Sequence, residues 1–126
     1  MFEEDEWAEI AARLVRLTQA HRLSWELEDR QSGQTFVTDA TRFTRYELAA
    51  KDNDNRFPFT LSVYQRDGAN PDRPYDTFET IPFNPEDGSP SDWINDLFPL
   101  VRRNVTGAPK IAAALLRELD SLAESD

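Results

Sequence analysis

The spacing of apolar residues changes twice along this chain, and the change limits the folds that the chain can adopt. Between residues 3 and 21 the apolar residues recur at intervals of three and four, which places them on one face of a helix. Between residues 23 and 63 they mostly alternate with polar residues, as in strands with one buried face. After residue 93 the helical spacing returns. The sequence therefore predicts a helix, then strands, then helices.

The charges along the first segment also indicate a helix. Acidic residues fill positions 3–6, where the helix dipole favours negative charge, and Arg13, Arg16 and Arg22 lie toward the other end. The predicted apolar face consists of Trp7, Ile10, Ala11, Leu14, Leu17 and His21.

Four or five strands are predicted to follow, over residues 23–28, 35–38, 42–48, 57–66 and 75–81. The clearest is the fourth, in which Phe57, Phe59, Leu61 and Val63 point inward. Pro58 removes a hydrogen-bond donor, so we expect it at a sheet edge or among the first residues of its strand. In the third strand, Phe43 and Tyr46 could share a face only through a bulge.

Two helices are predicted at the C-terminal side. Ser89 is a good N-cap, Pro90 suits the first helical position, and Asp92 completes a capping box. This helix reaches about Val105, and Pro99 is expected to kink or restart it. A break at residues 106–109 precedes a last amphipathic helix with Ile111, Ala112, Leu115, Leu116, Leu119 and Leu122 on its apolar face.

These elements define an α+β fold. We expect an N-terminal helix, an antiparallel four- or five-stranded meander and two C-terminal helices packed on one face of the sheet. With 126 residues, the chain is close to the commonest domain size, so residues 1–126 are expected to form a single domain.

Residues near both ends resemble a pattern found in short bacterial hypothetical proteins. Trp7, Leu14, Thr18, Leu23 and Trp25 match its opening helix and first strand, and Leu97, Phe98, Val101, Arg102 and Arg103 match its closing helix. The chain departs from the pattern at His21, where Gly is usual, and at Pro99. The resemblance implies the same order of elements and a prokaryotic source, and it supplies no catalytic residue.

The residue types needed for most catalytic and metal sites are scarce. The chain has no cysteine and one histidine, so cysteine nucleophiles, paired histidine ligands and Ser/His/Asp triads have no starting point in the sequence. We therefore expect no enzymatic activity, no metal and no cofactor. The absence of cysteine and the acidic start, which is unlike a secretory signal, favour a cytoplasmic location.

The formal net charge is -10, and such a field repels nucleic-acid phosphates and anionic lipids. Direct binding of nucleic acid or of a membrane is therefore not expected. No segment approaches the roughly 20 apolar residues of a membrane span.

Several polar groups resemble parts of functional sites but have simpler structural interpretations. His21 falls at a helix C-terminus, where the dipole favours a cation. The run from Asp52 to Asn55 resembles the start of a calcium loop but lacks the later Gly and Glu ligands, so a turn is expected. Glu26 and Glu28 share the outer face of the first predicted strand and are expected to stay ionised rather than act as an acid and base pair.

The best candidates for a binding surface lie in the helix that follows Ser89. Trp93 and Phe98, beside the proline, are the aromatic residues that we most expect to be exposed. Arg102 and Arg103 could bind a carboxylate or phosphate, and Arg42 and Arg45 form a second basic pair. The predicted binding residues are therefore Trp93, Phe98, Arg102 and Arg103.

The function that the sequence favours is a small acidic protein-interaction module, such as an adaptor, inhibitor or immunity-type protein, with a protein partner or self-association. One alternative is an acidic mimic of nucleic acid that inhibits a DNA- or RNA-binding enzyme. Another is a small-ligand-binding domain, which a deep pocket lined by Arg42, Tyr46 and Arg102 would favour.

Overall fold

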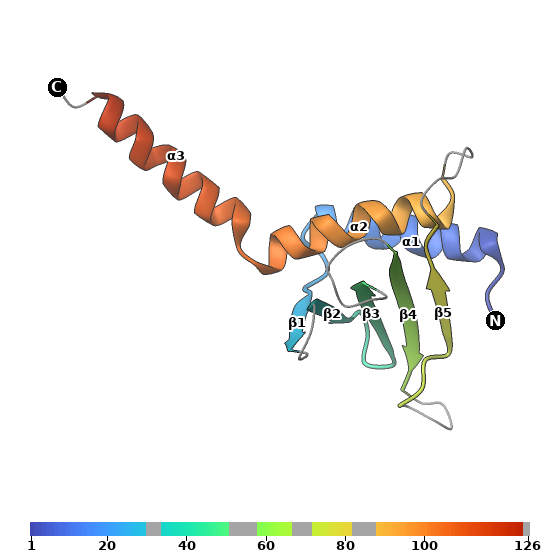
Figure 1. The fold of residues 1–126 in the computed structure, drawn as a ribbon. Coiled ribbons are helices and arrows are strands. Elements are labelled where there is room, and N and C mark those ends of the chain that lie inside the picture. Colours follow the sequence, from blue (N-terminus) through green and yellow to red (C-terminus); the bar gives the residue numbers. More distant parts are fainter. Residues whose placement is uncertain (30–33, 51–57, 67–71, 82–87, 125–126) are drawn as a thin grey trace.

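One helix, five strands and two further helices follow one another in a computed structural model that describes residues 1–29, 34–50, 58–66, 72–81 and 88–124 (Figure 1). This order confirms the predicted α+β class. The elements are α1 (Glu4–Gln19), β1 (Glu26–Asp29), β2 (Gln34–Asp39), β3 (Thr44–Ala50), β4 (Phe59–Gln65), β5 (Asp76–Glu79), α2 (Pro90–Val105) and α3 (Ala108–Glu124).

The five strands form one antiparallel sheet in which each strand pairs with its neighbours in sequence. Residues that are paired directly across neighbouring strands have their side chains on the same face of the sheet. The pairing register therefore gives a row of side chains that crosses all five strands on one face. That row runs from β1 to β5 through Leu27, Phe36, Leu48, Leu61 and Phe78. Its central members are fully buried, which identifies this as the core face of the sheet.

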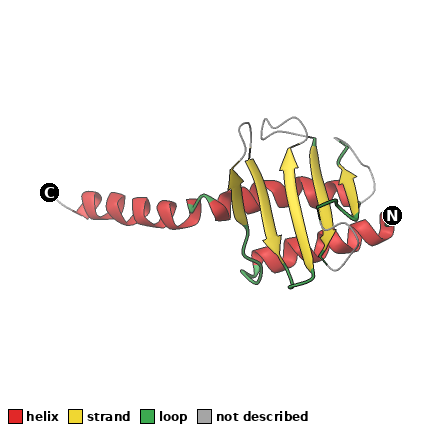
Figure 2. Ribbon diagram, turned by 90° about the horizontal axis from the view of Figure 1, so that it is seen from below, coloured by secondary structure: helices red, strands yellow, loops and turns green. Residues whose placement is uncertain are grey.

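Helices α1 and α2 lie together on one side of the sheet, and the other face carries no helix that the structure describes (Figure 2). The uncovered face bears a row that is mostly polar, from Glu26 through Val37, Glu47 and Ser62 to Thr77. The sheet thus has one apolar and one mainly polar face, as the alternation in the sequence predicts.

Both packed helices begin with the caps that their sequences encode. In α1 the backbone N–H of Glu3 donates to the Glu6 carboxylate (3.0 Å), and in α2 the hydroxyl of Ser89 accepts from the backbone N–H of Asp92 (3.3 Å). Pro99 lies inside α2, which nevertheless runs as one helix and is not restarted there.

The core fills the space between this helix pair and the sheet. Among the described residues it contains no buried ionisable side chain and is built from aromatic and aliphatic groups. Its largest members are Trp7, Leu14, Trp25, Phe36, Leu48, Phe59, Leu61, Ile94, Leu97, Phe98 and Val101.

The strand ends differ from the sequence prediction in two places. β1 begins at Glu26 rather than at residue 23, because Trp25 is fixed before the strand by a hydrogen bond from its indole N–H to the Thr18 hydroxyl (3.0 Å). β3 begins at Thr44, so Phe43 is outside the strand and no bulge is needed to place Tyr46. Pro58 directly precedes β4, as predicted, and Phe57 lies outside the described residues.

The last helix, α3, follows Gly107, whose φ of 74° requires a residue that tolerates the left-handed region. α3 makes its main contacts with α2, and none of its residues is buried. Both ribbon views show it extending away from the sheet and from α1 and α2 (Figures 1 and 2). We call α1, the sheet and α2 together the body.

Candidate functional site

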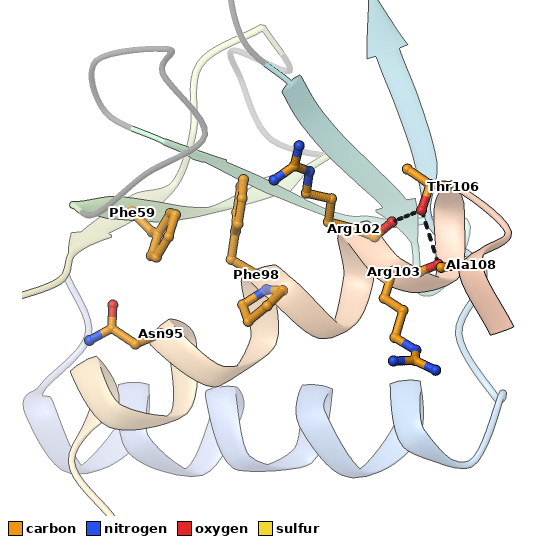
Figure 3. Close-up of a pocket in the computed structure, with 8 residues that line it drawn as sticks. Phe59, Asn95, Phe98, Arg102, Arg103, Thr106 and Ala108 are labelled. Carbon is orange, nitrogen blue, oxygen red and sulfur yellow. Dashed lines mark hydrogen bonds between the residues drawn. The ribbon is translucent and has the colours of Figure 1, made fainter. Parts of the chain in front are cut away.

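Three of the four predicted binding residues lie around one groove on α2. Phe98, Arg102 and Arg103 line this groove, together with Phe59 of β4 and residues at the junction of α2 and α3 (Figure 3). Its volume is about 380 Å³. The full lining is Phe59, Asn95, Phe98, Pro99, Arg102, Arg103, Thr106 and Ala108. We call it the α2 groove.

Phe98 forms the floor of the α2 groove and is not the exposed residue that the sequence led us to expect. It is 2% exposed, its ring stacks on Phe59 with centroids 4.2 Å apart, and it meets Phe36 edge-on at 5.6 Å. The prediction was wrong because Pro99 does not interrupt α2, so Phe98 keeps its place on the face that packs against the sheet.

Arg102 and Arg103 are both exposed, but they do not converge on one point. Figure 3 shows their guanidinium groups pointing away from each other, as expected for adjacent residues about 100° apart around a helix. Their backbone carbonyl oxygens accept from the Thr106 hydroxyl at 2.8 and 3.2 Å, which closes the end of α2. The two side chains therefore do not form a joint binding site for one carboxylate or phosphate.

Trp93 lies apart from the α2 groove, in the seam between α1 and α2. It is half-buried, and the guanidinium of Arg16 from α1 lies 5.9 Å from its ring centroid. A shallow hollow of about 260 Å³ beside it is lined by α1 residues and by Gly88. Trp93 and Phe98 thus do not form the exposed aromatic patch that the sequence suggested.

His21 is at a turn that ends α1 and not on the apolar face of the helix. Its φ is 57°, and the N–H groups of His21 and Arg22 donate to the carbonyls of Thr18 (3.1 Å) and Leu17 (2.8 Å). This is a Schellman motif with His21 at the position where Gly is favoured. The imidazole is exposed, and the part of the chain that the structure describes holds no group of three residues suited to bind a metal ion.

The remaining sequence candidates are also separate from the α2 groove. The guanidinium of Arg42 stacks on Phe43 at 4.9 Å, and Arg45 pairs with Asp39 at 3.1 Å. Tyr46 packs against the core, and burial raises the pKa of its phenol. Neither Arg42 nor Tyr46 joins Arg102 in the groove lining. The stretch from Asp52 to Asn55 lies outside the described residues.

Acidic side chains are distributed over several parts of the body. One group is in the first turn of α1, at residues 4–6, and another is on the uncovered face of the sheet, with Glu26 and Glu47. A nucleic-acid mimic would need such groups in a single stripe, and these two groups lie on different faces.

Within the part of the chain that the structure describes, five of the exposed large apolar side chains lie on α3, which holds none of the predicted binding residues. Its large aliphatic side chains are all more than half exposed: Ile111 57%, Leu115 51%, Leu116 61%, Leu119 60% and Leu122 68%. Together with Ala112 they form what we call the α3 face. The sequence predicts that this helix packs on the sheet, and the break at residues 106–109 is the one sequence feature that sets it apart from α2.

Comparisons with protein-family models, with curated proteins and with solved structures find no match to this chain. Among the helices that the structure describes, none has the length and apolar character to cross a membrane.

Proposed function

We propose that this protein is a small, acidic, non-enzymatic interaction module of the cytoplasm and that α3 is the element with which it binds another protein chain. The observation that carries the proposal is the exposure of every large aliphatic side chain on the α3 face. An apolar patch of this extent on a globular protein marks a surface that another molecule covers.

The contrast between α3 and the other two helices supports this role. Trp7, Leu14 and Val15 in α1 and Leu97 and Val101 in α2 use their apolar faces to form the core. α3 has an equally one-sided pattern but contributes nothing to that core. An amphipathic helix presented in this way can pack against a second helix or into an apolar groove.

Site-specific photo-crosslinking in the producing cells tests this function. A benzoylphenylalanine placed at Leu119 should form adducts with a protein chain, whereas the same probe at Ala113 should not. Ala113 is on the same helix but about 120° away from Leu119 around its axis, outside the α3 face. Absence of any protein adduct from the α3 face, or equal adducts from both positions, would contradict the proposal.

The α2 groove supports a second candidate function, the binding of a small apolar carboxylate. Phe59, Phe98 and Pro99 give it an apolar lining, and the guanidinium of Arg102 supplies a cation.

Titration with phenylacetate, followed by amide chemical shifts, tests this candidate. Shifts should concentrate around Phe98, and Arg102→Gln should weaken binding about tenfold because one charged hydrogen bond is lost. Arg13→Gln is the matched control, since Arg13 is an exposed arginine of α1 that does not line the α2 groove. Equal effects of the two substitutions would exclude the groove as the site.

A further inference from the structure

We propose that a second copy of this protein, paired antiparallel, covers the α3 face. This inference rests on the proposed function. α3 then serves as a dimerisation arm that joins two bodies.

The spacing of the α3 face is the same when read in either direction. Ala112, Leu115, Leu119 and Leu122 follow one another at intervals of three, four and three, the spacing of a coiled-coil seam. In an antiparallel pair this places Ala112 opposite Leu122 and Leu115 opposite Leu119. Each layer of the interface is then apolar, and a small residue faces a large one at both ends.

The charges of α3 leave the centre of the α3 face apolar. α3 carries two basic and three acidic residues, whereas the whole chain has a net charge of -10. By helical geometry, Lys110, Arg117 and Glu124 lie on the side opposite the α3 face, whereas Glu118 and Asp120 lie at its two edges. The centre of the α3 face, around Leu115 and Leu119, therefore carries no charge that a second copy would have to desolvate.

The antiparallel orientation also separates the two acidic bodies. α3 has 17 residues and is therefore about 25 Å long. Each body is attached at the first residue of its α3, so an antiparallel pair places the bodies at opposite ends, beyond the Debye length of about 8 Å at physiological salt. A parallel pair would bring two strongly negative bodies side by side.

The exposed area fits a reversible dimer. Five aliphatic side chains that are more than half exposed present roughly 500 Å² per copy, less than the roughly 800 Å² per partner of a standard interface. We therefore expect weak association that depends on protein concentration.

Sedimentation equilibrium of the full chain tests the pairing. The mass should rise from 14.5 kDa toward twice that value as concentration increases. Leu119→Asp should keep the mass at 14.5 kDa, whereas Ala113→Asp, which adds the same charge outside the α3 face, should associate like the unmodified chain. Circular dichroism checks that both variants stay folded. A chain that is monomeric throughout, or two variants that behave alike, would overturn the proposal.

The orientation can be tested with single cysteines, because the chain has none of its own. An oxidised mixture of Ala112→Cys and Leu122→Cys should give disulfide-linked dimers, and each variant alone should give few. Efficient linkage of each variant alone would show a parallel pair and overturn the antiparallel arrangement.

These results also separate the dimer from the broader function. A monomeric chain whose Leu119 probe crosslinks to a different protein would refute the dimer and leave the interaction module standing. A monomeric chain whose probe gives no protein adduct would refute both.

Discussion

At the scale of single residues, the backbone at His21 is strained for a reason that the structure identifies. Its φ of 57° falls in the left-handed region, which costs a non-glycine residue about 1 kcal/mol or more. The position is retained because the turn satisfies the last carbonyls of α1.

Replacing His21 with Gly should therefore increase the free energy of unfolding by about 0.5–1 kcal/mol. Urea denaturation at neutral pH measures the change. Gln19→Gly is the control, because residue 19 is helical and glycine there should lower stability by a similar amount. If both substitutions destabilise the protein, the backbone at residue 21 is not strained.

Tyr46 gives the fold a dependence on alkaline pH. Burial raises the pKa of its phenol above the ordinary value of 10.0, so the folded state holds the proton more tightly than the unfolded state does. Its contribution to stability is complete below about pH 10 and is lost as the pH rises through the folded pKa.

Tyr46→Phe lacks the group that titrates in this range. Between about pH 9 and 11 its free energy of unfolding should therefore fall less steeply than that of the unmodified chain. The comparison needs unfolding curves at several pH values in that window. Tyr75→Phe, which removes the same hydroxyl from a residue that is 52% exposed, is the matched control. An identical pH dependence for Tyr46→Phe and the unmodified chain would refute this role.

At the scale of elements, sequence spacing and capping chemistry predict most of the fold. The Ser89, Pro90 and Asp92 pattern correctly places the start of α2, and the alternation of Phe59, Leu61 and Val63 correctly gives the core face of β4. These signals are local, so they are readable without the rest of the structure.

What sequence could not predict depends on contacts between elements. Phe98 has the same apolar character whether it packs on Phe59 or faces solvent, and only the fold distinguishes the two. The apolar faces of α2 and α3 are likewise similar in sequence, but one packs on β4 and the other is exposed. The α3 face was therefore predictable as a helix face and not as a binding surface.

Because α3 has no buried residue, removing it should have little effect on the body. A chain that ends at Gly107 should unfold with a free energy within about 0.5 kcal/mol of that of the full chain, measured at low protein concentration. Leu97→Ala in the full chain, at a fully buried position, should cost about 2–5 kcal/mol and serves as the comparison. A large loss on truncation would show that α3 belongs to the core.

At the scale of the whole molecule, the net charge of -10 opposes both compaction and association. Added salt screens this repulsion, so raising sodium chloride from about 20 to 200 mM should increase thermal stability and tighten the dimer. Scanning calorimetry and sedimentation follow the two effects. Weaker self-association at higher salt would contradict an apolar interface between like-charged copies.

A second copy covering the α3 face is the central claim, and hydrogen exchange of the α3 backbone amides tests it directly. A helix without packing partners opens readily, so these amides should exchange fast in dilute protein and become protected as concentration rises. The same amides in Leu119→Asp should exchange fast at every concentration. Fast exchange of α3 in the unmodified chain at all concentrations would contradict the dimer, as would protection that does not depend on concentration.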